Sequence, residues 1–165
     1  VVCYKPGAVE LIEFLKKNNV KIALASGTSR KSVMHHLKEV DAEDIFETIV
    51  CGSEVENGKP APDVFLKTAE NMGVAPVDCF VFEDSENGIR AGHAAGMKVI
   101  GVPDMVEFKP ETKKLMLYEF ERIDMAIEAD GREYAMGYNM TARNEEVTTT
   151  SITPVRTAAI IVTLE

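Results

Sequence analysis

Apolar and polar residues follow a helical pattern and then a strand pattern near the start of the chain. The segment between Pro6-Gly7 and Asn18-Asn19 places apolar residues at helical spacing, and Pro before it and Asn after it are typical helix boundaries. Residues 20–25 then form a short, largely apolar run that a turn follows at once. The pattern predicts an amphipathic helix followed by a buried strand.

The same alternation repeats along the chain as far as residue 102. Further strands are expected at residues 48–51, 79–82 and 98–102, and further helices at residues 30–38, at residues 63–72 and between Ser85 and Gly96. Strands that alternate with helices and short turns predict a parallel sheet with right-handed crossovers. The predicted fold class is therefore α/β, with a doubly wound, Rossmann-like parallel sheet between helices.

After residue 102 the pattern becomes weaker. We expect a helix at residues 110–120 with a second directly after it, and a polar, Thr-rich linker at residues 147–154. Residues 158–164 are again apolar and rich in β-branched side chains, which is typical of a strand. The predicted domain organisation is a core at residues 1–129 and an atypical tail at residues 130–165, which contains the linker and the terminal strand.

The composition excludes some classes of partner. The chain has 165 residues, which suits one domain, and its formal net charge is -9. This charge argues against nucleic acid or an anionic membrane as the main partner, because both bind clustered Lys and Arg. Cys3, Cys51 and Cys79 lack paired spacing, so we expect free thiols in a reducing compartment and a cytoplasmic location. The oligomeric state is not predicted by the pattern.

Polar side chains follow three of the predicted strands. Ser26 begins the turn after the first strand, Lys59 lies in the loop after the second, and Glu83-Asp84 ends the third. Taken one at a time, these residues read as a helix cap, a solvated loop lysine and an acidic turn. The loops after parallel strands meet at one edge of a sheet, however, so the three groups can converge. A hydroxyl, an ammonium and two carboxylates that suit Mg²⁺ are the groups that phosphoryl transfer requires.

Three ordered motifs carry a resemblance to a known family. They are Ile22-Ala23-Leu24-Ala25-Ser26-Gly27-Thr28-Ser29, Gly58-Lys59-Pro60-Ala61-Pro62-Asp63-Val64-Phe65, and Val81-Phe82-Glu83-Asp84-Ser85 with the Gly and Ala residues up to Met97. In this order the chain resembles the haloacid dehalogenase (HAD) superfamily, in the subgroup of sugar-phosphate phosphatases and beta-phosphoglucomutase. The resemblance covers about residues 6–106.

The resemblance implies a role for each matching residue. Ser26, Gly27, Thr28 and Lys59 would bind the substrate phosphate, and Ser26 and Lys59 would take part in catalysis. Asp84 and Glu83 would hold Mg²⁺ as the cofactor. The implied function is a Mg²⁺-dependent phosphatase that acts on small phosphorylated metabolites such as sugar phosphates.

One family motif does not occur in this chain. The family's nucleophile and general acid/base come from an Asp-x-Asp-x-Thr segment on a central strand, and the sequence contains no such segment. The resemblance therefore implies a catalytically incomplete fragment or variant, with the missing strand and the cap expected upstream of Val1. Two alternatives stay open: a non-catalytic HAD-like protein with a binding role, and a phosphomutase.

Residues 160–165 have the apolar run and the spacing of that missing strand, with Thr163 and Glu165 where two Asp residues would stand. The segment could fill the central slot of the sheet, but we expect an edge strand or a disordered end of unrelated sequence. Two other classes are disfavoured. A response-regulator receiver would carry its acids first and its Lys last, and residues 25–30 lack the paired glycines of a dinucleotide site.

Overall fold

The computed structural model describes residues 5, 7–104, 106–122 and 159–163, and every structural statement below concerns these residues. Its α-helices are α1 (Ala8–Lys17), α2 (Arg30–Glu39), α3 (Asp63–Met72), α4 (Glu86–Ala94) and α5 (Pro110–Lys113). Short 3₁₀ turns occur at η1 (Gly52–Glu54) and η2 (Pro76–Asp78). Its strands are β1 (Lys21–Ser26), β2 (Thr48–Cys51), β3 (Cys79–Glu83), β4 (Lys98–Gly101), β5 (Tyr118–Glu119) and β6 (Ala159–Thr163).

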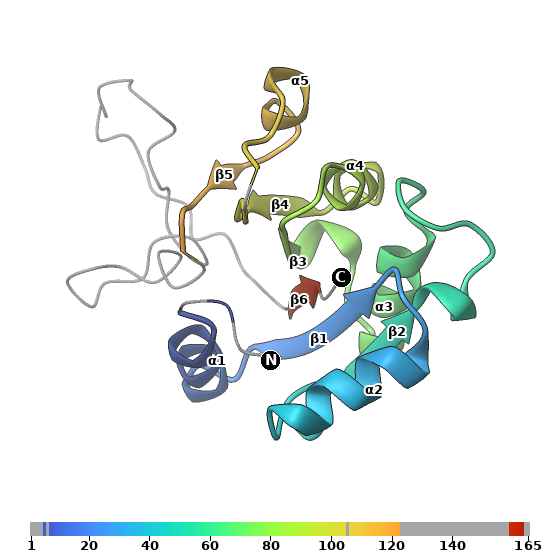
Figure 1. Cartoon of the computed structure of the whole chain (residues 1–165), viewed down its shortest axis with the longest axis vertical. Helices are drawn as coiled ribbons and strands as arrows, with labels where there is room; N and C mark the ends of the chain where they lie inside the picture. Colours follow the sequence, from blue (N-terminus) through green and yellow to red (C-terminus); the bar gives the residue numbers. More distant parts are fainter. Residues whose placement is uncertain (1–4, 6, 105, 123–158, 164–165) are drawn as a thin grey trace.

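The strands form one parallel sheet in the order β2-β1-β6-β3-β4-β5 (Figure 1). The predicted α/β, Rossmann-like fold class is confirmed. Because every pair is parallel, the carboxyl ends of all strands lie at the same edge of the sheet. Ser26 and Glu83 are the last residues of β1 and β3, and Lys59 and Asp84 lie in the loops that follow β2 and β3. All four therefore lie at one edge of the sheet, as expected from the sequence.

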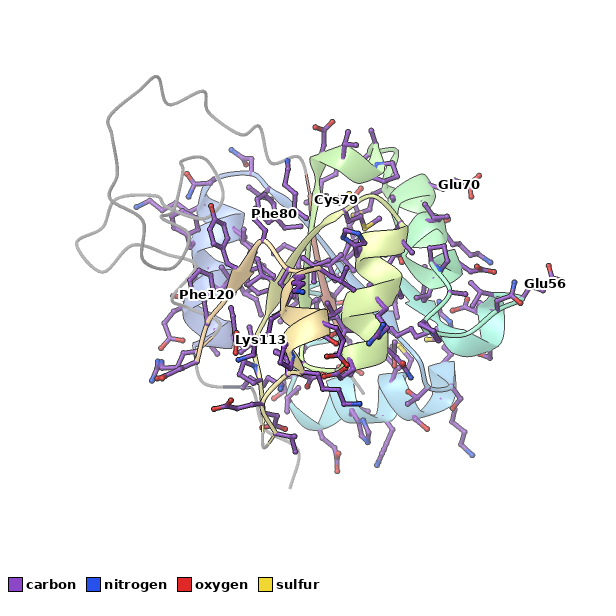
Figure 2. All side chains as sticks on the ribbon, turned by 90° about the horizontal axis from the view of Figure 1, so that it is seen from above. Glu56, Glu70, Cys79, Phe80, Lys113 and Phe120 are labelled. Atoms are coloured by element: carbon purple, nitrogen blue, oxygen red, sulfur yellow. The ribbon has the colours of Figure 1, made fainter. Side chains whose placement is uncertain are left out.

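Helices pack on both faces of the sheet. Alternate residues of a strand point to opposite faces, and the buried side chains separate accordingly. One cluster joins Ala23, Ala25, Val81 and Ile161 of the strands to α3 and α4, and another joins Ile22, Phe80, Phe82 and Ile100 to α1. Cys79 and Phe80, which are neighbours in β3 and are labelled in Figure 2, belong to different clusters. Glu56 and Glu70, by contrast, extend outward from the molecule in that view.

The terminal strand β6 lies in the centre of the sheet, between β1 and β3. Ile161 pairs with Ala23 on one side and with Val81 on the other, and Ala159 and Ile161 are fully buried. The expectation of an edge strand or a disordered end is therefore wrong for residues 159–163. The alternative, that this segment fills the central slot, is confirmed for the same residues. Glu165, the Thr-rich linker and the predicted boundary at residue 130 lie outside the described residues.

The predicted helix at residues 110–120 is also wrong in its second half. Helix α5 ends at Lys113, and the chain then turns and pairs with β4. The backbone N–H groups of Leu117 and Phe120 donate to the carbonyl oxygens of Val99 (2.7 Å) and Gly101 (2.9 Å). The open edge of β4 offers these acceptors, and they outweigh the local helical pattern. The second helix predicted after residue 120 lies almost wholly outside the described residues.

Two of the three cysteines lie within the described residues, and both Cys51 and Cys79 are free and buried, as expected. Burial, with a smaller contribution from Asp78, raises the pKa of the Cys79 thiol to about 11. The thiol is therefore neutral at physiological pH and packs as an apolar group. Among the described helices, none is long and apolar enough to cross a membrane.

Candidate active site at the carboxyl edge of the sheet

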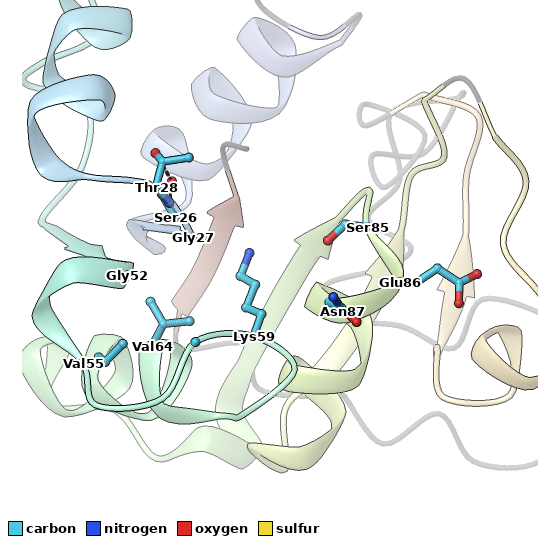
Figure 3. A pocket seen from close by; sticks show the side chains of 11 residues that line it. Ser26, Gly27, Thr28, Gly52, Val55, Lys59, Val64, Ser85, Glu86 and Asn87 are labelled. Atoms are coloured by element: carbon cyan, nitrogen blue, oxygen red, sulfur yellow. Dashed lines mark hydrogen bonds between the residues drawn. The ribbon is translucent and has the colours of Figure 1, made fainter.

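A pocket of about 460 Å³ opens at the carboxyl edge of the sheet. Its walls come from the loops after β1, β2 and β3 (Figure 3). The lining residues are Ser26, Gly27, Thr28, Gly52, Val55, Gly58, Lys59, Val64, Ser85, Glu86 and Asn87. The structure thus brings the predicted phosphate-binding residues of two separate motifs to one cavity.

The end of β1 and the loop after it present two hydroxyl groups to this pocket, those of Ser26 and Thr28. Ser26 is fully buried, and its Oγ accepts a hydrogen bond from the backbone N–H of Thr28 (3.1 Å) and lies 2.9 Å from Thr28 Oγ1. Ser26 does not cap the following helix, because Ser29 does so by accepting a hydrogen bond from the backbone N–H of Ser32 (3.3 Å). The interpretation of Ser26 as a helix cap is therefore wrong, and its position at the pocket needs another explanation.

The loops after β1 and β2 touch through their backbones. A Cβ on Gly52 would lie 2.4 Å from the carbonyl oxygen of Gly27, so a larger residue would push the two loops apart. Glu54 fastens the second loop, since it accepts hydrogen bonds from the backbone N–H of Cys51 (2.7 Å) and from Arg30 Nη2 (3.1 Å). Burial opposes the charge of Glu54, but these two donors outweigh it and hold the pKa below its ordinary value.

Lys59 reaches the pocket from the loop after β2 (Figure 3). Its side chain is only 6% exposed, and its Nζ donates to Glu83 Oε1 at 2.5 Å. The ammonium also lies 5.3 Å from the centroid of the Phe65 ring, a distance suited to a cation–π contact. The interpretation of Lys59 as a solvated loop lysine is therefore wrong, because a buried carboxylate and an aromatic ring hold its charged end.

Glu83 lies beneath this lysine with a fully buried side chain. Its second oxygen, Oε2, accepts three hydrogen bonds, from the backbone N–H groups of Asp84 (3.1 Å) and Ser85 (3.0 Å) and from Ser85 Oγ (2.9 Å). Gly88 makes room for it, since a Cβ there would lie within 2.1 Å of the carboxylate atoms. The carboxylate predicted to bind metal is thus engaged on both oxygens and does not line the pocket.

Asp84, the other predicted metal residue, has a different environment. Its side chain is 20% exposed, and its Oδ2 lies 2.6 Å from Lys5 Nζ. Asp84 does not line the pocket either, although Ser85 beside it does. Within the described part of the chain, no group of three or more His, Cys, Asp or Glu side chains could hold a metal ion. A Mg²⁺ ion that keeps most of its waters needs only one or two protein carboxylates, so Asp84 satisfies this condition.

Several residues near the site were not predicted from the sequence to belong to it, among them one close-packed glycine and three polar residues. Gly52, Glu86 and Asn87 line the pocket, and Lys5 pairs with Asp84. Glu86 accepts hydrogen bonds from the backbone N–H of Lys109 (2.8 Å) and from Thr112 Oγ1 (2.6 Å), and these donors lower its pKa. Glu86 and Asn87 follow Ser85 directly, so their place in the motif is the signal that could have identified them. Nothing in the pattern around Lys5 indicates its partner.

A family model decides the relationship of the chain. The model described as haloacid dehalogenase-like hydrolase matches residues 2–102, well over half of the sequence. The chain belongs to this family. The matched range contains Ser26, Lys59 and Asp84 but ends before β5 and β6, so the central strand β6 lies outside the matched residues.

Individual members of the HAD family match a similar part of this chain. The chain is 39% identical over 95 residues to "Phosphorylated carbohydrates phosphatase" of Thermotoga maritima, an alignment of 58% of this chain and 44% of that protein. It is 48% identical over 107 residues to "Probable pseudouridine-5'-phosphatase" of Drosophila melanogaster, covering 60% and 46%. Among solved structures, beta-phosphoglucomutase from Clostridium difficile superposes with a TM-score of 0.63 at 29% identity, over 73% of this chain and 51% of that one. The chain therefore spans about half the length of these HAD relatives, or slightly less.

Proposed function

We propose that this chain forms the phosphate-binding and metal-binding part of a phosphatase that acts on small phosphorylated metabolites, sugar phosphates in particular. The observation that carries the proposal is the buried Lys59 ammonium, which lines one pocket with the Ser26 and Thr28 hydroxyls. A cation and two hydroxyls around a pocket suit a phosphate dianion. The names of the Thermotoga and Drosophila relatives, each a phosphatase, support the same substrate class.

The residues of the pocket would share the work of binding phosphate. The hydroxyls of Ser26 and Thr28 and the backbone of Gly27 would donate hydrogen bonds to phosphoryl oxygens. Lys59 would offset the negative charge that develops during phosphoryl transfer. Glu83 would act through Lys59, because its short hydrogen bond fixes the position of the ammonium.

We further propose Mg²⁺ as the cofactor, with Asp84 as the residue that contacts it. A carboxylate at the carboxyl end of a central strand is an oxygen ligand of the kind that Mg²⁺ prefers, and it already pairs with a cation in this structure. Bound Mg²⁺ would supply charge neutralisation at the phosphoryl oxygens. Glu83 is proposed as the residue that positions Lys59 and not as a metal ligand, since both its oxygens are engaged.

The covalent step needs a nucleophile that we do not assign to any described residue. Among the residues that line the pocket, Glu86 carries the carboxylate, but both its oxygens accept hydrogen bonds, from the Lys109 backbone and from the Thr112 hydroxyl. We therefore do not assign Glu86 as the nucleophile. Thr163 ends the central strand β6, and its hydroxyl donates to the carbonyl oxygen of Phe82 (2.9 Å). We therefore propose that this chain alone binds phosphate but does not turn over substrate. The two alternatives are a binding role without catalysis, and a phosphomutase, which the beta-phosphoglucomutase structure supports.

Binding of inorganic phosphate tests the assignment of the pocket. Replacing Ser26 with alanine is expected to weaken phosphate binding about ten-fold, the value of one hydrogen bond to a charged group. The exposed Ser53, which lies outside the pocket lining, provides the matched control, and its alanine variant should bind like the wild type. Isothermal titration calorimetry would measure both affinities. If Ser26→Ala and the wild type bind phosphate equally well, this pocket is not the phosphate-binding site.

A Mg²⁺-dependent assay with p-nitrophenyl phosphate tests the catalytic proposal. The isolated chain is expected to show no turnover. Because β6 occupies the central slot, activity is expected when a segment that carries the family's Asp-x-Asp-x-Thr motif takes the place of β6 between β1 and β3, and Asp84→Asn should then abolish it. An ordinary enzymatic rate from the chain alone would show that our account of the nucleophile is wrong. Phosphate binding without turnover in either case would favour the non-catalytic alternative.

A further inference from the structure

A lysine ammonium lies against the carboxylate that we assign to the metal. Lys5 Nζ is 2.6 Å from Asp84 Oδ2 and 3.9 Å from Asp104 Oδ2. Asp84 follows β3 and Asp104 follows β4, two neighbouring strands of the sheet. The lysine side chain is 35% exposed, that of Asp84 is 20% exposed, and that of Asp104 is 72% exposed. A positive charge thus lies between two acidic groups at the carboxyl edge.

The backbone next to Lys5 fixes the start of its side chain. The carbonyl oxygen of Lys5 accepts a hydrogen bond from the backbone N–H of Ala8 (3.0 Å), at the first turn of α1. Gly7 adopts a left-handed conformation with a φ of 86°, which turns the chain into the helix. The helix packs on the sheet through the buried Leu11 and Leu15. The attachment point of the lysine is therefore tied to the core, while its four-carbon chain can change direction.

We propose that Lys5 is an intramolecular competitor of the divalent cation at Asp84. This inference rests on the proposed function, because it concerns the same metal carboxylate. An ammonium at 2.6 Å occupies the space and the oxygen that a metal ion would take, and the two positive charges repel each other. A metal ion can therefore bind Asp84 only when the Lys5 ammonium moves away from it.

Asp104 gives the displaced ammonium a second partner. It already lies within 3.9 Å of the same Nζ and is largely exposed, so the lysine can turn toward it with little change in the surrounding structure. In the absence of metal, Lys5 neutralises the partly buried Asp84 carboxylate. In the presence of metal, Asp104 receives the lysine. The arrangement lowers the affinity for Mg²⁺ without removing the site.

Titration of Mg²⁺ by calorimetry tests the competition. Lys5→Met is expected to bind Mg²⁺ about five- to ten-fold more tightly, the size expected when one unit charge is removed near a dication at a partly exposed site. Lys5→Arg should bind like the wild type. Lys17→Met, at the far end of α1, makes the same change in net charge and should leave the affinity unaltered. Equal affinity of Lys5→Met and wild type would overturn the inference.

A second readout uses the wild-type chain and does not depend on how the variants fold. Acetylation of lysines by a low dose of acetic anhydride, followed by mass spectrometry, should modify Lys5 faster when Mg²⁺ is present, and Lys17 at the same rate in both conditions. Unchanged labelling of Lys5 at saturating Mg²⁺ would also overturn the inference. The variant Asp84→Asn distinguishes the assignment of the metal to Asp84 from the competition by Lys5. If it abolishes Mg²⁺ binding while Lys5→Met has no effect, the metal assignment stands and the competition is wrong. If it binds Mg²⁺ like the wild type, both are wrong.

Discussion

Replacing Lys59 with methionine is expected to lower the free energy of unfolding by about 3–5 kcal/mol, the usual cost of breaking a buried ion pair from one side. The side chain is 6% exposed and that of its partner Glu83 is fully buried. Without the ammonium, the carboxylate keeps its hydrogen bonds from Ser85 but loses the positive charge that compensates its burial. Unfolding by urea, followed by circular dichroism, would measure the change.

A double-mutant cycle shows whether the charge pair is the cause. Glu83→Gln alone leaves a buried ammonium without its carboxylate and should also destabilise the protein. The variant that carries both substitutions removes both charges, so its loss of stability should be clearly smaller than the sum of the two single losses. Lys38→Met, on the exposed surface of α2, controls for the loss of one lysine and should stay within about 0.5 kcal/mol of the wild type. If the two single losses of stability add strictly, the Lys59–Glu83 charge pair is not their cause.

The convergence of Ser26 and Lys59 could be predicted from the sequence for a simple reason. Alternating strands and helices determine a parallel sheet, and a parallel sheet brings all its carboxyl ends to one edge. The position of each polar group along the chain then suffices to place it near the others. The burial of Lys59 could not be predicted in this way, because it depends on Phe65 and Glu83 being beside it.

The direction in which the Glu83 side chain points could have been predicted from the sequence. Cys79, Val81 and Glu83 share one face of β3 because alternate residues point the same way. Since Cys79 and Val81 belong to the cluster under α3 and α4, Glu83 points toward that layer as well. Gly88, five positions later, makes room for its carboxylate. Asp84 lies just past the end of β3 and has its own partner, Lys5, so the two adjacent carboxylates do not form one acidic pair.

Two features depended on tertiary contacts that no local pattern contains. The predicted helix extended to residue 120, but the free edge of β4 pairs with Tyr118 and Glu119, which form strand β5. Lys5 stands before α1 and reaches Asp84 at the end of β3, a pairing set by how the helix packs on the sheet. Both contacts join residues that are distant along the chain, so no local pattern contains them.

The unbroken apolar run Ile160-Ile161-Val162 could have indicated the central place of β6. Edge strands usually alternate apolar and polar residues or carry charges, whereas a parallel strand that is buried on both faces reads as a continuous hydrophobic run. The position of β6 in the chain concealed this, because it follows a long polar segment and lies outside the range matched by the family model. The composition of the strand was the better guide.

Deleting residues 159–165 is expected to abolish cooperative unfolding. The strand pairs with β1 on one side and β3 on the other, so its removal would leave two strands of the core with open hydrogen-bonding edges. It would also expose the cluster that Ile161 shares with α3 and α4. Thermal unfolding by calorimetry and near-ultraviolet circular dichroism would show a broad, low-enthalpy transition and a loss of fixed side-chain packing.

A single substitution tests the same strand in a chain that still folds. Ile161→Ala is expected to cost about 2–5 kcal/mol, the range for truncating a fully buried large aliphatic residue to alanine. Val77→Ala, at a valine that is 62% exposed, should change stability by less than about 0.5 kcal/mol. If the deletion variant unfolds as cooperatively as the wild type and Ile161→Ala is neutral, β6 does not fill the slot. Another segment would then pair with β1 and β3 in its place, and the residue at the end of that segment would be the one that lies near Ser26 and Lys59.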